Sequence, residues 1–242
     1  MVRGPLLLLP GLLCDAAVWT PLLALQPALG DAADCQIMAY GHADSIDAMA
    51  RAVLRQAPVK FALAGHSMGG RVALEVMRLA PQRVTRIALF DTGYQARPAG
   101  DAGERERAER LALLELARSE GMRVMAERWA SGMVHMERLA DKALMNAILD
   151  MIERKSADIF AAQINALLER PDATALLPQI ACPTLLLCGR EDAWSPLARH
   201  QQMAAMMPRA HFAIIDDCGH MSTMERPETV AATMLAWLEQ PA

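Results

Sequence analysis

The stretch KFALAGHSMGGRVALE, residues 60–75, places Ser67 between two glycines in the pattern Gly-x-Ser-x-Gly. Chance alone produces this pattern in about one chain in ten of this length. Its surroundings are more informative, because an apolar run (60–64) that predicts a buried strand precedes it and a helical pattern (68–79) follows it. A serine on a sharp strand-to-helix turn has the setting of a nucleophile elbow. The stretch therefore predicts that Ser67 is a nucleophile rather than an ordinary turn serine.

The glycines around Ser67 fit such a turn. Neighbouring chain crowds the positions two before and two after the serine, and Gly65 and Gly69 carry no side chain there. Gly70 allows the following helix to approach the strands closely. The N–H groups at the start of that helix would point to the place where an oxyanion forms.

Short apolar runs alternate with helical patterns along most of the chain. The runs lack period-2 alternation, which is typical of strands buried on both faces of a parallel sheet. We therefore expect an α/β fold with a doubly wound, mostly parallel sheet of about six strands. The expected strands are 5–9, 35–39, 60–64, 86–90, 184–188 and 211–215, and the expected helices are 46–56, 68–79, 196–206 (with Ser195 as its cap) and 227–239.

The interval 93–177 breaks this rhythm, because it contains helical patterns and no good strand. We expect it to form a helical cap inserted into a core made of residues 1–92 and 178–242. Its helices are expected at about 102–119, 122–131, 137–153 and 156–169. Such a cap would emerge at the carboxyl edge of the sheet, where α/β sheets bind ligands.

A serine hydroxyl is a poor nucleophile without a base, so an acid and a histidine are expected downstream, each at the end of a strand. Asp192 follows the run 184–188, and His220 follows the run 211–215. The order Ser67, Asp192, His220 is the order expected for this kind of elbow. Asp91, at the end of the run 86–90, is the alternative acid.

The loop after the first strand, LPGLLCD, is placed to supply an oxyanion donor. Gly11 allows close approach of the backbone, and we expect the N–H groups of Leu12 and Met68 to be the two donors. Leu13, Trp129 and Met133 are predicted to line the substrate pocket. Methionine at helical spacing is more often core than pocket wall, so these three are the least supported of the expected site residues.

Composition excludes several classes of protein. The chain has 242 residues, 53% hydrophobic and 21% charged, with a net charge of -4 and no basic stripe, so we expect neither nucleic-acid nor membrane binding. It contains no metal-binding motif and no glycine-rich nucleotide loop, so no metal or other cofactor is expected.

The cysteines indicate the cellular compartment of the protein. Five cysteines without C-x-x-C spacing, three of them in or beside apolar runs, predict buried thiols in a reducing, cytoplasmic compartment. The early leucine run is interrupted at Pro10-Gly11, which favours a strand and a loop over a secretory signal. The sequence does not indicate an oligomeric state.

Four stretches together resemble the α/β-hydrolase superfamily over essentially the whole chain: LLLLPGLL, AGHSMGGRVALE, CPTLLLCGREDAWSP and CGHMSTMERPETV. Within the superfamily the chain is most similar to small, capped serine hydrolases. Two departures stand out. Many relatives have His-Gly where this chain has Pro10-Gly11, and many begin with two further strands, one of them antiparallel.

The resemblance implies a serine hydrolase that cleaves a small carboxylic ester or lactone through an acyl-enzyme. It also allows hydrolysis of a carbon–carbon bond beside a ketone, or a lyase reaction, with the same triad, since one fold hosts many chemistries. A third interpretation is a non-catalytic small-molecule binder that retained the pocket. A panel of esters distinguishes the first two, and loss of Ser67 distinguishes the third.

Overall fold

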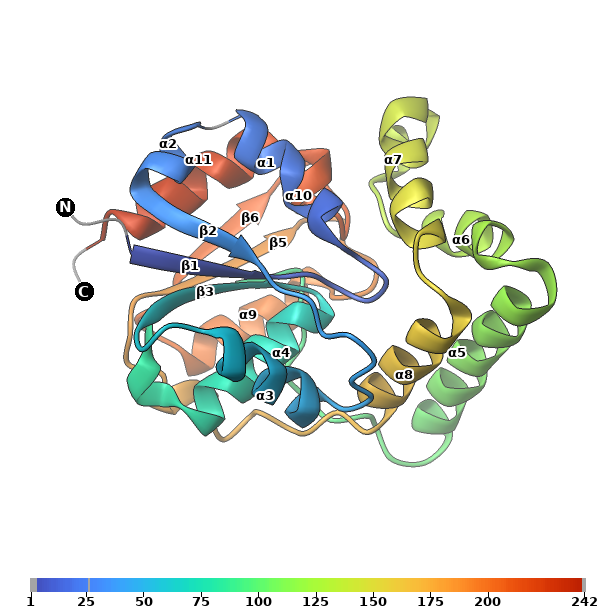
Figure 1. Ribbon diagram of the computed structural model, residues 1–242, viewed down its shortest axis with the longest axis horizontal. Helices are drawn as coiled ribbons and strands as arrows, with labels where there is room; N and C mark the ends of the chain where they lie inside the picture. The colour runs from blue at the N-terminus through green and yellow to red at the C-terminus, as the bar shows by residue number, and fades with distance from the viewer. Residues whose placement is uncertain (1–3, 26, 241–242) are drawn as a thin grey trace.

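The computed structural model describes residues 4–25 and 27–240. In these residues six strands form one sheet in the order β2-β1-β3-β4-β5-β6, and every neighbouring pair is parallel. The expected doubly wound sheet is thereby confirmed (Figure 1). The strands are Gly4–Leu9 (β1), Ala33–Ile37 (β2), Phe61–His66 (β3), Val84–Phe90 (β4), Thr184–Gly189 (β5) and His211–Ile215 (β6).

Burial explains which strands the sequence predicted well. The central strands β3 and β5 are buried along their whole length, as their continuous apolar runs require. Strand β2 lies at an edge, and its residues alternate between more and less exposed positions. Without a continuous apolar run its start was hard to place, and the expected strand 35–39 begins two residues too late.

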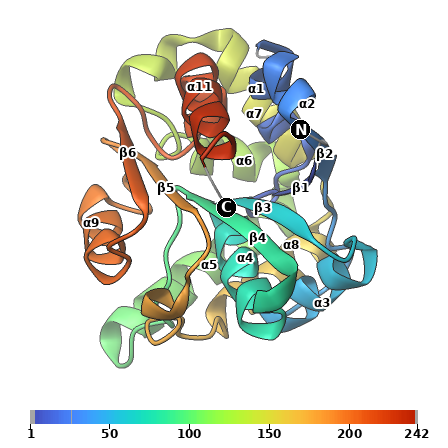
Figure 2. The same ribbon diagram turned by 90° about the vertical axis from the view of Figure 1, so that its left-hand side faces the viewer.

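Helices cover both faces of the sheet, as the view in Figure 2 shows. One face carries Thr20–Leu25 (α1), Pro27–Ala32 (α2) and Pro227–Leu238 (α11), and the other carries Ile46–Gln56 (α3), Met68–Leu79 (α4) and Leu197–Met206 (α9). Helices α1 and α2 were not expected from the sequence.

The start of α9 corrects one expectation. Pro196, not Ser195, is the capping residue of α9, and no side chain caps the helix. The helix therefore begins at Leu197, one residue later than the sequence predicted, and Ser195 lies outside it.

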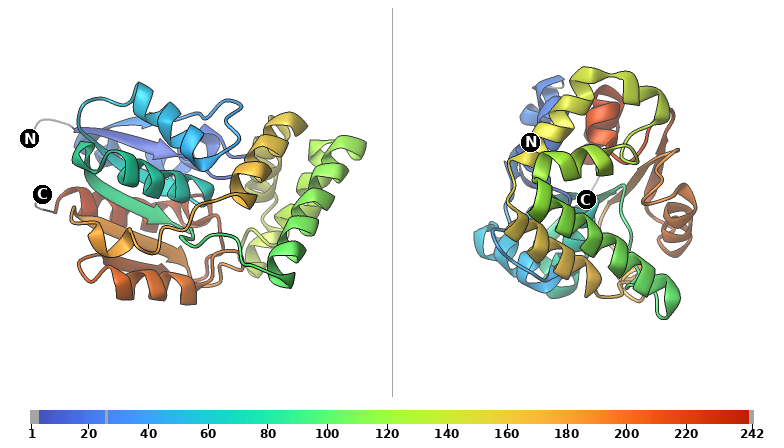
Figure 3. Two further views of the ribbon diagram at one scale, coloured as in Figure 1. Left: turned by 90° about the horizontal axis from the view of Figure 1, so that it is seen from below. Right: turned by 90° about the vertical axis from the view of Figure 1, so that its right-hand side faces the viewer.

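Four α-helices are inserted between β4 and β5: Asp101–Glu120 (α5), Met122–Ala130 (α6), Lys142–Glu153 (α7) and Ala157–Leu168 (α8). They stand over the carboxyl edge of the sheet, as the views in Figures 1 and 3 show. A separate short 3-10 turn, Met136–Ala140, precedes α7, where the sequence predicted one continuous helix over 137–153. A short helix, Ser222–Glu225 (α10), precedes α11.

The cysteines correct a second expectation. Cys188 is buried, but Cys35 and Cys182 are only half-buried, because the first lies on edge strand β2 and the second precedes β5. All five thiols are free. In the part of the chain that the structure describes, no helix is both long and apolar enough to cross a membrane.

Candidate active site

Ser67 occupies the turn between β3 and α4 in a conformation that L residues rarely adopt. Its φ is 55° and its ψ is -117°. A Cβ added to Gly65 would lie 2.3 Å from the carbonyl oxygen of Gly69, and a Cβ added to Gly69 would lie 2.1 Å from that of Leu9. Both separations are too short for any side chain, so the turn requires glycine at both positions. The residue expected to react is thus one of the strained positions of the described backbone.

Three side chains from three loops form one chain of hydrogen bonds. Ser67 Oγ lies 2.8 Å from His220 Nε2, and His220 Nδ1 lies 2.8 Å from Asp192 Oδ2. The other carboxylate oxygen, Asp192 Oδ1, accepts hydrogen bonds of 2.8 Å from the backbone N–H groups of Trp194 and Ser195. The backbone therefore holds the carboxylate, and the carboxylate holds the imidazole ring toward Ser67.

The protonation equilibria of this pair suit a catalytic base. Burial of the His220 ring lowers its pKa, but the charge and hydrogen bond of Asp192 outweigh burial, so the pKa of His220 is raised above 6.5. Burial likewise raises the pKa of Asp192. The attraction of His220 and the backbone hydrogen bonds outweigh it, so the pKa of Asp192 is lowered from 3.8. The carboxylate thus stays ionised beside the ring.

Asp91, the alternative acid, forms no hydrogen bond with His220 in the described part of the chain, and its Oδ2 lies 3.8 Å from Nε2 of another histidine, His66. Its Oδ1 accepts a hydrogen bond of 2.9 Å from the Gly189 N–H, and its Oδ2 accepts one from the Ser222 hydroxyl. Asp91 is fully buried. Burial and the charge of Asp192 raise the pKa of Asp91 well above its ordinary value. The geometry thus favours Asp192 as the partner of His220.

Glu225 holds the loop that carries His220, a role that the sequence analysis missed. Its buried carboxylate accepts hydrogen bonds from the N–H groups of Gly219 (3.0 Å), Met221 (3.1 Å) and His135 (2.7 Å). Two of these donors flank His220, and the third belongs to the insertion. The burial of a carboxylate next to the histidine motif is not visible from sequence spacing, and only the folded loop shows it.

The two residues expected to supply oxyanion donors, Leu12 and Met68, lie close to Ser67. A Cβ added to Gly11 would lie 3.1 Å from the Cβ of Ser67, which shows how closely the loop after β1 approaches the serine. Within residues 4–25 and 27–240, neither the Leu12 N–H nor the Met68 N–H has a hydrogen-bond partner. Both residues line the cavity beside Ser67. Two such unpartnered donors could bind an oxyanion.

A cavity of about 330 Å³ opens beside Ser67. Trp129 and Met133 line it, as expected from the sequence. Leu13 does not line it: its side chain is fully buried, and its N–H donates a hydrogen bond of 2.8 Å to Gln163 Oε1. The positive φ of 58° at Leu13 bends the loop there, a local turn that the apolar sequence could not show.

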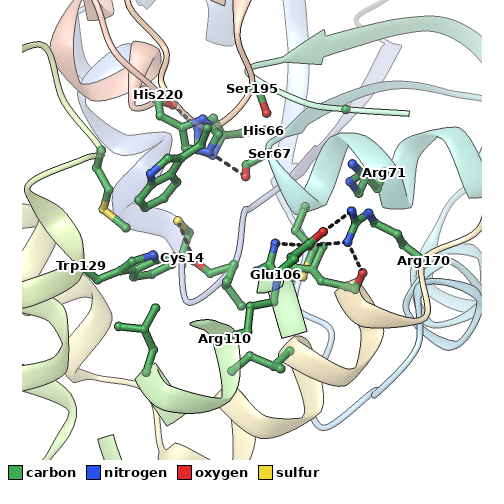
Figure 4. A pocket seen from close by; sticks show the side chains of 18 of the residues that line it. Cys14, His66, Ser67, Arg71, Glu106, Arg110, Trp129, Arg170, Ser195 and His220 are labelled. Atoms are coloured by element: carbon green, nitrogen blue, oxygen red, sulfur yellow. Dashed lines mark hydrogen bonds and ion pairs between the residues drawn. The ribbon is translucent and has the colours of Figure 1, made fainter. Parts of the chain in front are cut away.

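Trp194 is a further wall residue that the sequence analysis missed. Its ring stacks on that of Trp129, with centroids 4.8 Å apart, and its centroid lies 5.0 Å from that of His220. Figure 4 shows Trp129 in the cavity together with Ser67 and His220. The sequence offered one signal for Trp194, namely its place two residues after Asp192. No group of three or more His, Cys, Asp or Glu side chains in the described residues is arranged to hold a metal ion.

Comparisons with known proteins agree with this fold. The model of the Alpha/beta hydrolase family matches residues 6–233. The chain belongs to the alpha/beta hydrolase family. This alpha/beta hydrolase is 26% identical over 242 residues to the pimeloyl-[acyl-carrier protein] methyl ester esterase of Aromatoleum aromaticum, with 96% of each chain covered.

Solved structures of relatives superpose over nearly the whole alpha/beta hydrolase. A thermophilic esterase from Thermogutta terrifontis, solved with malate bound, is 30% identical with a TM-score of 0.83, covering 98% of this chain and 90% of that one. The enol-lactonase from Burkholderia xenovorans LB400 has a TM-score of 0.85 at 19% identity, covering 99% and 93%. The second likeness concerns the fold alone.

Proposed function

We propose that this protein is a serine hydrolase that cleaves a small carboxylic ester or lactone through an acyl-enzyme. The observation that carries the proposal is the continuous chain of 2.8 Å hydrogen bonds from Ser67 through His220 to Asp192. The two esterases to which the chain is 26% and 30% identical support the same class of reaction.

The first half-reaction follows from the geometry. His220 Nε2 takes the proton of Ser67 Oγ as that oxygen attacks the ester carbonyl, and Asp192 stabilises the imidazolium that forms. The negative charge that develops on the carbonyl oxygen is stabilised by the N–H groups of Leu12 and Met68. His220 then gives its proton to the leaving alkoxide, and the acyl group remains on Ser67.

The second half-reaction repeats these roles with water as the nucleophile. His220 removes a proton from water, the hydroxide attacks the acyl carbonyl, and Ser67 leaves with the proton. We propose that α5 to α8 act as a cap that covers the cavity and sets which acyl and alcohol groups fit. We also propose a cytoplasmic location, since the five thiols are all free.

A turnover panel tests the proposal. Methyl and p-nitrophenyl esters, five- and six-membered lactones and vinylogous 1,5-diketones are offered to the wild type and to the Ser67→Ala and His220→Ala variants. We expect turnover of esters or lactones, a pre-steady-state burst of p-nitrophenol, and a loss of kcat of roughly 10⁴- to 10⁶-fold in either variant.

Two results would contradict the proposal. Turnover of the diketones alone would assign carbon–carbon hydrolysis to the same triad. Unchanged ester turnover in Ser67→Ala would remove the serine from the mechanism altogether. Circular dichroism of each variant shows that the loss of turnover is not a loss of fold.

A further inference from the structure

Four arginine side chains line the same cavity as Ser67. They come from helices that cover the sheet and from the insertion, which meet at this place. Figure 4 shows three of them grouped around a glutamate on one side of Ser67, with Trp129 and His220 on the other. The four are Arg71 on α4, Arg110 on α5, Arg170 just after α8, and Arg199 on α9.

Two of these arginines share one carboxylate. The carboxylate of Glu106 accepts two hydrogen bonds from Arg170, of 2.6 Å and 2.8 Å, and pairs with Arg110 at 3.0 Å. Burial raises the pKa of Glu106, but these two guanidinium groups outweigh it and hold the pKa at about 2. Glu106 is therefore ionised, and its single negative charge faces two paired arginines, so the cluster keeps a net positive charge although Glu106 also attracts Arg71.

The other two arginines have no carboxylate partner. Among the described residues, no Asp or Glu oxygen lies within 4.0 Å of the guanidinium of Arg71 or Arg199. Each donates only to a backbone carbonyl: Arg71 Nη1 to Gln95 at 2.8 Å, and Arg199 Nη1 to Trp194 at 3.0 Å. A guanidinium has five N–H donors, so most donors of both groups remain unused.

These two guanidinium groups converge on one place. A Cβ added to Gly93 would lie 2.6 Å from Arg71 Nη2 and 3.4 Å from Arg199 Nη1. Burial lowers the pKa of Arg71 to about 9, and the charges of Arg170 and Arg199 add to the effect. Like charges gathered in a half-buried place are costly unless an anion joins them. The absence of a side chain at Gly93 keeps the place open.

The paired donors share a cavity with the nucleophile. Arg71 lies four residues after Ser67 on α4, about one helical turn away, and both line the cavity. The lining also includes the apolar side chains of Trp129, Phe160 and Ile164. The cavity thus combines apolar side chains, the candidate nucleophile and four arginines, which outnumber the two glutamates of the lining, Glu106 and Glu109.

We propose that Arg71 and Arg199 bind a carboxylate carried by the substrate, so that the protein acts on esters or lactones of anionic acids in preference to neutral ones. The planar fork of each guanidinium matches the two oxygens of a carboxylate. This inference rests on the proposed role of Ser67 for the reaction itself, but the anion site can be measured without turnover.

Matched substrates test the proposal. The monomethyl esters of succinate, glutarate and adipate are compared with the methyl esters of the corresponding carboxamides, which have the same shape without the charge. We expect kcat/KM for at least one acid to exceed that for its amide by roughly 10-fold or more. The ratio should fall as ionic strength rises, because salt screens the attraction.

Arginine variants locate the effect. We expect Arg71→Gln and Arg199→Gln each to lower the acid-to-amide ratio by roughly 10-fold, toward a ratio of one, while Arg71→Lys lowers it less. Arg107→Gln, an equal loss of charge at an exposed position on α5, should keep the wild-type ratio. Because the ratio compares two substrates in one preparation, partial misfolding cancels.

A wild-type ratio near one, or a ratio that neither Arg71→Gln nor Arg199→Gln changes, would overturn the proposal. If these arginines had a purely structural role, their loss would lower kcat/KM equally for the acid and the amide. The ratio would then stay at its wild-type value, and the proposal would be refuted.

A binding measurement that needs no turnover tests this inference separately from the proposed reaction. Glutarate is titrated into the Ser67→Ala variant, and tryptophan fluorescence reports binding through Trp129 and Trp194, which line the cavity. Adding Arg71→Gln should weaken this binding at least 10-fold. Glutarate binding without turnover of any ester in the wild type would remove the hydrolase reaction and leave the anion site standing. Ester turnover with no glutarate binding would remove the anion site and leave the hydrolase reaction standing.

Discussion

A methyl group at Gly69 would test whether the tight turn positions the reaction. In Gly69→Ala the new Cβ would lie 2.1 Å from the carbonyl oxygen of Leu9 and 2.7 Å from that of Pro10. Normal contact needs at least about 3 Å, so α4 and the loop after β1 must separate by roughly 1 Å. The Met68 N–H belongs to the first of these segments and the Leu12 N–H to the second.

A separation of that size has a predictable effect. A 1 Å misplacement of catalytic groups costs about 100-fold in rate, so kcat/KM for p-nitrophenyl acetate should fall about 100-fold in Gly69→Ala. Overpacking should cost about 1–3 kcal/mol of unfolding free energy, which lowers Tm by roughly 2–12 °C. The variant should remain folded at 25 °C, as circular dichroism can show.

A second glycine supplies the control. Gly30 lies in helix α2 with no atom within 4 Å of an added Cβ, so Gly30→Ala should keep full activity. It should gain about 0.5–1 kcal/mol of stability from helix propensity. If Gly69→Ala retained kcat/KM within about threefold of wild type and an unchanged Tm, close packing of the turn would not be what aligns the two donors.

Three further outcomes follow from the ionisable groups. Since His220 must be neutral to accept a proton and its pKa is raised above 6.5, the acid limb of the kcat/KM–pH profile should have its midpoint above pH 6.5; a midpoint below 6.5 would contradict this. Asp192→Asn should lower kcat by about 10⁴-fold and Asp91→Asn by less than about 10-fold, and equal losses would contradict the assignment of the acid. Glu106 has its pKa lowered from 4.5 to about 2, so its ion pairs stabilise the fold above pH 4.5 and this contribution is lost as the pH falls through 2. Glu106→Gln should therefore lower the free energy of unfolding at pH 7 by about 1–2 kcal/mol in urea titrations, because water screens part of these ion pairs, and a difference that persists unchanged at pH 2 would refute the linkage.

Local sequence patterns were sufficient for much of the fold. Continuous apolar runs identify buried central strands, because such strands have no solvent face and so no alternation. Residues 46–56 and 68–79 form helices with the expected bounds. The edge strand β2 and the helices α1 and α2 were harder, since partial exposure leaves a weaker apolar pattern.

The sequence likewise predicted part of the site. Spacing and strand ends indicated Ser67, Asp192 and His220, but left Asp91 as an alternative acid, because both carboxylates follow sheet strands. Only the fold shows that Asp91 accepts its hydrogen bonds from Gly189 and Ser222, whereas His220 bonds to Asp192.

Most residues that line the cavity could not be predicted from the sequence. The stack of Trp129 on Trp194 joins residues 65 positions apart, and the arginines come from four separate segments. Arg71 is the exception in principle. Its place one helical turn after Ser67 could have marked it as a neighbour of the reaction.

The central claim is that Ser67 is an activated nucleophile. The most direct measurement is mass spectrometry of the intact protein and its peptides after treatment with a fluorophosphonate, which reacts with activated serines whatever the substrate. We predict one adduct on the peptide that contains Ser67, and no adduct in the folded His220→Ala variant, because the serine then lacks its base. A folded wild-type protein that forms no adduct, or a variant that is labelled as fast as wild type, would contradict the claim.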